Sequence, residues 1–221
     1  MYFRLVIALS SLVLFSSCMK IDSHIGVTSS GSASYSATLD VSQMMTLLSS
    51  FGTGANTPIE KDLCKNEDFQ DSLEKSAEKQ KDKIDAIVCT SLGDYKARID
   101  GTIHLDKKKS VLVLSGVTIV DLLAFSDVER SPYVADSNDA SMNPEDLGFS
   151  IKQTYTLPGK IAYTEVGTLS GASTLIVNLL DKNVLKRKSL IAITTESGEK
   201  LTQKQIMSYK RQYRAYISKK K

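Results

Sequence analysis

The sequence predicts an α+β protein, with antiparallel strands in one or more sheets and a few helices. Two observations support this class. Short alternating or continuous apolar stretches, separated by Gly, Pro and charged turns, recur through most of the chain and are typical of antiparallel strands. Helical spacing of apolar residues is confined to the stretches near residues 40–52, 67–88 and 202–217. A hydrophobic content of 42% and a charged content of 24% are those of an ordinary globular domain, so we expect a substantial core.

The first 17 residues have the layout of a signal segment. Arg4 precedes an apolar run over residues 5–15, which is too short to cross a bilayer comfortably as a helix, and two serines then lead into Cys18. We therefore expect residues 1–17 to be removed and Cys18 to become an acylated N-terminus. An ordinary signal peptide with a chance cysteine, or an uncleaved anchor, is the alternative.

The residues before Cys18 resemble the lipobox of bacterial lipoproteins, in which a branched apolar residue and two small residues precede the lipidated cysteine. Phe15 stands where Leu is usual. The resemblance implies an exported protein that is held at a membrane through Cys18, because two or three acyl chains anchor a protein effectively permanently. Since Met19 and not Asp follows the cysteine, the resemblance implies the outer membrane in a cell with two membranes. In other cells it implies the outer face of the cell membrane.

We expect residues 18–198 to form one α+β domain and residues 199–221 to form a basic C-terminal helix. Residues 127–147 contain two prolines and several Asp, Ser and Asn, which is typical of a flexible loop. Acidic side chains in this loop suggest a calcium site, but their spacing matches no calcium-loop motif, so a solvated loop is the favoured interpretation.

The cysteines predict a disulfide. With Cys18 acylated, Cys64 and Cys89 remain, and an oxidising compartment would pair them. The alternatives are two free thiols or a soft-metal pair. Metal binding is disfavoured because His24 and His104 are the only histidines and neither lies at ligand spacing from a cysteine. We expect no metal and no cofactor.

Strand signals come first in the mature chain. Apolar residues of one parity occupy residues 21–27 and 35–41 on either side of a Ser/Gly-rich turn, which predicts a hairpin. Asp40 and Gln43 then have the spacing of a capping box, and a helix is expected to follow until Gly52.

A second, highly charged helix is predicted over residues 67–88, lying across the outside of the sheet and fastened by the disulfide. Strands are expected over residues 95–105 and again at several places between residues 149 and 194. The unbroken apolar run at residues 111–120 predicts a strand that is buried on both faces or placed centrally. This run is the best candidate for the core.

Short motifs recur along residues 18–195, and their most distinctive residues are Gly31, Tyr35, Leu39, Leu157, Pro158, Gly159, Gly171 and Ala192. These motifs resemble the mycobacterial-type LppM domain and related bacterial lipoproteins of unknown function. The resemblance implies an envelope lipoprotein with an α+β fold and supplies no catalytic residue. A disulfide-linked helix and the lack of a C-terminal membrane span depart from that pattern.

The carboxyl end predicts an amphipathic basic helix. Thr202 and Gln205 can form a capping box, and apolar and tyrosine side chains follow on one face. Three interpretations remain open: the tyrosine face docks on the sheet with the cations solvated, the cations contact an anionic lipid or polymer of the envelope, or they bind nucleic acid, which fits an exported protein poorly. The candidate contact residues are Tyr209, Arg211, Tyr213, Arg214, Lys219, Lys220 and Lys221.

Catalytic motifs are missing from the sequence. Asp94, Asp100 and Asp106 recur near one strand, but evenly spaced surface carboxylates are common and the sequence indicates no raised pKa for them. We therefore expect a non-enzymatic binding or assembly module of the envelope. An enzyme acting on envelope glycans or lipids is the first alternative. A carrier of lipophilic ligands, with a cavity lined by Met44, Met45 and Leu48, is the second.

Overall fold

The computed structural model of the 221-residue chain describes most of the residues after position 19. The described residues are 20–30, 32–43, 45–46, 60–79, 84–104, 110–125, 150–179, 181–185, 187 and 189–219. The predicted signal segment with Cys18, the loop predicted at 127–147, and Lys220 and Lys221 lie outside them. Within the predicted first helix, residues 42–43 and 45–46 are helical, and the rest of that prediction also lies outside the described residues.

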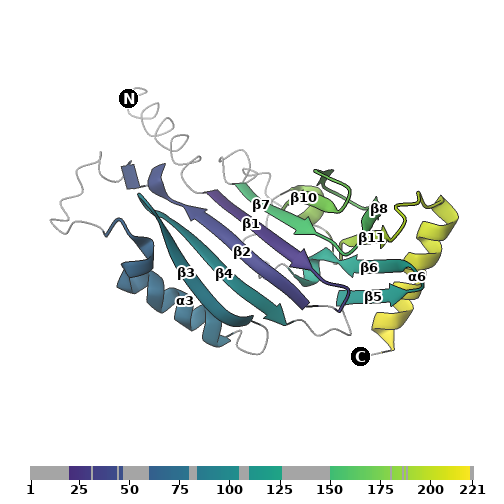
Figure 1. The fold of residues 1–221 in the computed structure, drawn as a ribbon, viewed down its shortest axis with the longest axis horizontal. Coiled ribbons are helices and arrows are strands. Elements are labelled where there is room, and N and C mark those ends of the chain that lie inside the picture. The colour runs from purple at the N-terminus through teal and green to yellow at the C-terminus, as the bar shows by residue number, and fades with distance from the viewer. Residues whose placement is uncertain are drawn as a thin grey trace, which may run out of the picture.

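The fold consists of two β-sheets and a few helices (Figure 1), which confirms the predicted α+β class. Neighbouring strands are antiparallel throughout except for the central pair β1 and β7. The large sheet has the order β3(Ile84–Gly93), β4(Lys96–His104), β2(Ser32–Asp40), β1(Lys20–Val27), β7(Ser150–Thr156), β10(Thr174–Asn178), β9(Thr168–Leu169). The small sheet has the order β5(Val111–Leu114), β6(Val117–Asp121), β11(Ile191–Thr195), β8(Lys160–Thr164).

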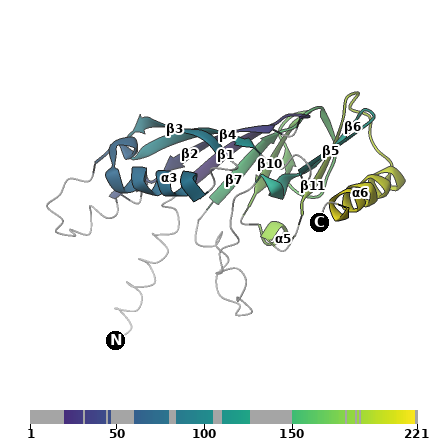
Figure 2. The ribbon, with the colours of Figure 1, turned by 90° about the horizontal axis from the view of Figure 1, so that it is seen from below.

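The two long helices, α3(Glu67–Lys79) and α6(Gln203–Ser218), lie at opposite ends of the long axis (Figure 1). Figure 2 shows α3 along one face of the large sheet, near β3 and β4, and α6 beyond the small sheet. Three short helical turns complete the fold: η1(Leu63–Lys65), η2(Leu122–Ala124) and α5(Lys182–Leu185).

The main core lies between the two sheets. In the strands of the large sheet the odd-numbered residues point inward, as Ile25 of β1 and Tyr155 of β7 illustrate, and both are fully buried. The small sheet contributes Val120 and Ala192 to the same cluster. The even-numbered residues of the large sheet form its other, outer face.

The small sheet is buried on both sides, which explains its continuous apolarity. Val120 and Ala192 face the large sheet, whereas Ile119 and Ile193, of opposite parity, pack in a second cluster with α6. Every residue of β6 and β11 is buried.

The apolar run at residues 111–120 is not one strand, as predicted, but the hairpin of β5 and β6. Gly116 allows the reversal because its φ is +69°, in the region that only glycine adopts readily. β6 has the predicted burial on both faces, while β5 forms an edge on which Val113 is exposed. Hydropathy did not reveal this turn because Ser115 and Gly116 are its only polar or flexible residues.

The charged helix is shorter than predicted, because α3 ends at Lys79 and β3 begins at Ile84. Ile84 and Val88 pair with β4 on either side of a register shift, so this stretch belongs to the sheet and does not extend the helix. The predicted disulfide between Cys64 and Cys89 is present, with the two Cα atoms 5.8 Å apart. It joins η1 to β3 and therefore closes a loop that contains α3.

Candidate functional site

The C-terminal helix begins with the predicted capping box. The Thr202 hydroxyl accepts a hydrogen bond from the Gln205 backbone N–H at 3.3 Å, and the Gln205 side-chain oxygen accepts one from the Thr202 backbone N–H at 2.8 Å. The two bonds satisfy backbone donors that the first helical turn leaves free. The start of α6 is therefore fixed by its own side chains.

One face of α6 is packed against the small sheet. Ile206 and Tyr213 are buried, with Tyr213 only 1% exposed, and Tyr209 and Ile217 pack at the edges of the same cluster. This arrangement matches the interpretation in which the tyrosine face docks on the sheet. It also corrects one predicted contact residue, since Tyr213 is part of the core and cannot meet a partner while α6 is docked.

A polar contact holds the middle of α6 to the small sheet. The Lys210 ammonium donates hydrogen bonds to the Glu165 carboxylate and, at 2.8 Å, to the Tyr163 hydroxyl. Glu165 also accepts from the Ile191 backbone N–H at 3.2 Å and pairs with Arg187 at 3.4 Å. Burial alone would lower the pKa of Lys210, but the bonds to Glu165 and Tyr163 raise it above its usual value, so Lys210 stays charged.

The opposite face of α6 carries exposed cations. Lys204, Arg211, Arg214 and Lys219 are exposed, and none of them has an ion-pair partner among the described residues. The helix itself contains no acidic residue that could neutralise them. The predicted contact residues Arg211, Arg214 and Lys219 thus form one accessible surface, whereas Tyr209 is partly buried and packs against the cluster beneath α6.

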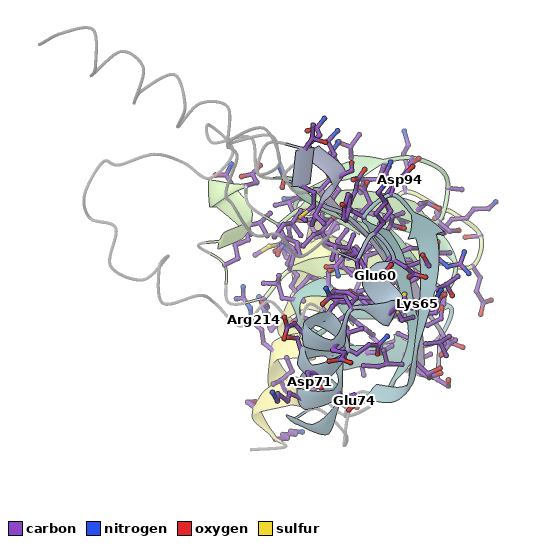
Figure 3. All side chains as sticks on the ribbon, turned by 90° about the vertical axis from the view of Figure 1, so that its left-hand side faces the viewer. Glu60, Lys65, Asp71, Glu74, Asp94 and Arg214 are labelled. Atoms are coloured by element: carbon purple, nitrogen blue, oxygen red, sulfur yellow. A yellow bond between two sulfur atoms is a disulfide. The ribbon has the colours of Figure 1, made fainter. Side chains whose placement is uncertain are left out.

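The α3 end of the molecule has a different charge pattern. Figure 3 views the molecule from that end and labels Lys65, Asp71 and Glu74 there, with Arg214 on α6. Lys65 pairs with Asp62 at 3.5 Å, and Lys75 pairs with Asp71 at 3.8 Å. Charges of both signs alternate on this surface, so it lacks the single sign of the α6 surface.

Asp121 is a buried carboxylate beneath α6. It accepts hydrogen bonds from the backbone N–H groups of Leu123, at 3.2 Å, and Leu190, at 3.0 Å. Burial raises its pKa to about 6, and the nearby Glu165 carboxylate adds to the rise. Through these two hydrogen bonds Asp121 links η2 to Leu190, the residue before β11. Asp121 therefore has a structural role.

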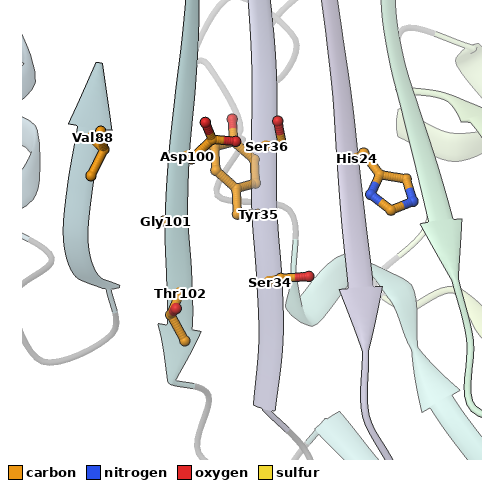
Figure 4. A pocket seen from close by; sticks show the side chains of 8 residues that line it. All are labelled: His24, Ser34, Tyr35, Ser36, Val88, Asp100, Gly101 and Thr102. Atoms are coloured by element: carbon orange, nitrogen blue, oxygen red, sulfur yellow. The ribbon is translucent and has the colours of Figure 1, made fainter. Parts of the chain in front are cut away.

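The outer face of the large sheet carries a shallow polar hollow of about 450 Å³ (Figure 4). Ser36 of β2 lies opposite Asp100 of β4 on one side and His24 of β1 on the other. Ser34 and Thr102 form the adjacent row. Three neighbouring strands therefore bring hydroxyl, carboxylate and imidazole groups together on an open surface.

The hydrogen bonds in the hollow do not form a catalytic relay. The Ser36 hydroxyl and the Arg98 guanidinium, with its Nε at 2.8 Å, bond to the Asp100 carboxylate and hold its pKa below the usual value. His24 Nε2 instead lies 2.9 Å from the Thr156 hydroxyl. A carboxylate with a lowered pKa is a weak general base, and Ser36 is not bonded to His24, so the geometry suits binding better than nucleophilic catalysis.

The other carboxylates considered in the sequence do not join the hollow. Asp94 lies in the exposed turn between β3 and β4, and Asp106 is outside the described residues. The described residues contain no group of three or more His, Cys, Asp or Glu side chains that could hold a metal ion. In the described part of the chain, no helix has the length and apolarity needed to cross a membrane.

Comparison with known proteins identifies no relative. No protein-family model, curated protein or solved structure matches this chain.

Proposed function

We propose that this protein is an exported, lipid-anchored module of the bacterial cell envelope that binds or assembles another envelope component without catalysing a reaction. The disulfide between Cys64 and Cys89 is the observation that carries the proposal. Disulfides persist in oxidising compartments and are rare in the cytosol, so a closed pair supports export. Export in turn supports the interpretation of residues 1–17 as a signal and of Cys18 as the acylated residue.

The proposed anchor is acylated Cys18. Met19 at the next position favours the outer membrane in a cell with two membranes, and the outer face of the cell membrane otherwise. Likeness to the LppM-domain group belongs to the same proposal. The proposed contact surface is the exposed side of α6, with Arg211, Arg214, Lys219 and the two final lysines.

The experiment that tests this proposal is the intact mass of the membrane-extracted protein beside a Cys18→Ala variant, each with and without reductant. We expect a mature chain that begins at Cys18 and carries acyl mass, which the variant lacks. Reduction should add about 2 Da to both proteins, because one disulfide becomes two thiols. A full-length chain without acyl mass would contradict the anchor, and a mass unchanged by reductant would contradict the oxidised pair.

A second candidate function is the binding of a neutral envelope glycan in the hollow of the large sheet. Asp100, Ser36 and His24 place hydrogen-bonding groups on an open surface, which suits a ligand rich in hydroxyl groups. Asp100→Asn and His24→Ala should each weaken binding of neutral N-acetylglucosamine oligomers, while Asp71→Asn on α3 should not. Hydrolysis of those oligomers, lost in Ser36→Ala, would instead favour the glycan-acting enzyme.

The carrier alternative has less support. Met45 packs at the edge of a third small cluster with Leu63 and Ala97, while Met44 and Leu48 lie outside the described residues. The hollow found on the described surface is polar, whereas a lipophilic ligand needs a mainly apolar cavity.

A further inference from the structure

We propose that the exposed face of α6 binds an anionic polymer of the envelope, and that it does so on the side of the domain that faces away from the anchoring membrane. The charge part of this inference depends on α6 alone. The orientation part rests on the proposed lipid anchor at Cys18.

The anchor would hold one end of the large sheet, where several strands begin or end, close to the bilayer. Only Met19 separates Cys18 from Lys20, the first residue of β1, so the two Cα atoms are at most about 7 Å apart. Lys20 is in register with Asp40 of β2 and Ser150 of β7, and Asp40 is in register with Lys96 of β4. The ends of four strands therefore lie together at this end of the sheet, and the strands extend from here toward the rest of the domain.

The α6 helix lies at the other end of the molecule. β1 points from its Lys20 end toward the small sheet, and α6 lies beyond that sheet in both Figure 1 and Figure 2. The eight residues of β1 alone span roughly 26 Å at about 3.3 Å per residue. Since the Debye length is about 8 Å at physiological ionic strength, cations at this distance hardly sense the charge of the anchoring bilayer.

The cations of α6 form an ordered stripe. Lys204, Arg211 and Arg214 are separated by seven and three residues, spacings that place side chains on one side of a helix over about 15 Å. The capping box, the buried Tyr213 and the bond from Lys210 to Glu165 fix the helix before any partner binds. A fixed stripe of charge loses less entropy on binding than a flexible tail.

The chemistry of this face favours a polymer over a lipid surface. Helices that bind bilayers insert an apolar face below the headgroups, but the apolar face of α6 is already packed on the small sheet. Within the described part of the chain, Met207 is the one large apolar side chain that α6 exposes. A chain with repeated phosphate or carboxylate groups can follow the stripe without insertion.

The test uses the lipidated mature protein in phosphatidylcholine vesicles. Binding of inorganic polyphosphate and of polygalacturonate distinguishes phosphate from carboxylate recognition, with neutral dextran as the control polymer. We expect at least one polyanion to bind with an affinity that falls as salt is added. Arg211→Gln with Arg214→Gln should weaken binding about tenfold or more. The matched double variant Lys61→Gln with Lys75→Gln, at the α3 end, should change it less than about twofold.

Orientation is tested by adding phosphatidylglycerol to the anchoring vesicles. If α6 faces away, polymer binding is unchanged by the anionic lipid. Suppression of polymer binding by phosphatidylglycerol would overturn the proposal in favour of α6 lying on its own membrane. Failure to bind either polyanion, or equal losses in the two double variants, would also overturn it. The unacylated Cys18→Ala chain should bind the polymers as wild type does, so a failed anchor is distinguishable from a failed polymer site.

Discussion

The two long helices occupy opposite ends of the molecule and are held there by different forces. None of the described side chains at residues 67–75 of α3 is buried, and its ion pair between Asp71 and Lys75 is exposed and worth little. α6 buries Ile206 and Tyr213 and also bonds Lys210 to Glu165. The α3 end therefore combines the covalent bond between Cys64 and Cys89 with partial packing of Phe69 on a small cluster, whereas the α6 end depends on fully buried side chains.

The difference shows that two amphipathic helices can be held against a sheet by different interactions. A helix with little apolar surface gains from a crosslink that restricts the unfolded chain. A helix with a full apolar face gains from burial, which the small sheet provides on its outer side. The difference also matters for the proposed contact surface. Because the apolar face of α6 is docked, the exposed cations on its other face remain accessible to a partner.

The largest expected effect is that of Tyr213→Ala. Removing the fully buried ring leaves a cavity between α6 and the small sheet, and large-to-small changes of aromatic core residues cost about 3 to 5 kcal/mol. Urea denaturation measures this loss. Arg214→Ala, one residue along but exposed, should change stability by less than about 0.5 kcal/mol. A loss below about 1 kcal/mol for Tyr213→Ala would mean that packing does not hold α6.

Next in size is the loss of the disulfide in Cys64→Ser with Cys89→Ser. The closed loop spans 25 positions, for which the chain-entropy model gives about 3 kcal/mol. Guanidinium denaturation of the double variant should show this loss, and limited proteolysis should cleave it first near α3. Cleavage that begins at α6 would contradict the assignment of the crosslink to the α3 end. Wild type treated with reductant is the control.

A pH-dependent contribution to stability is expected at the α6 end. Burial raises the pKa of Asp121 in the folded state to about 6 from its ordinary 3.8, so its protonation favours the folded state. The added stability is fully present below pH 3.8 and is lost as the pH rises through about 6. The difference of roughly two pKa units corresponds to up to about 3 kcal/mol.

Asp121→Asn keeps an oxygen that can accept from Leu123 and Leu190 but removes the titration. Thermal unfolding between pH 4 and 7 should lose much of its pH dependence in this variant and keep it in the exposed control Asp71→Asn. An unchanged pH profile in Asp121→Asn would exclude Asp121 as the group responsible.

The smallest effect is expected at the start of α6. Thr202→Ala removes the acceptor for the Gln205 backbone N–H and should cost about 1 kcal/mol. Gln203→Ala, in the next exposed position, should cost almost nothing. The comparison is sharpened by hydrogen exchange in the first turn of α6, which should speed up in Thr202→Ala alone.

Local signals in the sequence were sufficient for several elements. The hairpin of β1 and β2, the capping box at Thr202 and the pairing of Cys64 with Cys89 all depend on nearby residues or on residue count, and all three are confirmed. The apolar face of α6 was also predictable, because helical spacing alone defines it. Its burial is what removes Tyr213 from the contact surface.

Features that depend on tertiary pairing were not predictable in the same way. Residues 84–88 fit a helical stripe as well as a strand, and pairing with β4 decides between them. The hollow collects His24, Ser36 and Asp100 from three strands, so no local motif contains them. The alternation of Ser and Thr along β2 was a signal for an exposed sheet face, but it could not indicate which strands lie beside it.

The division between a crosslinked end and a packed end is tested most directly by hydrogen exchange of the full chain with and without reductant. Reduction of Cys64–Cys89 should speed exchange in α3, from Glu67 to Lys79, and leave α6, from Gln203 to Ser218, as protected as before. Faster exchange in both helices to the same extent, or no change in α3, would contradict it.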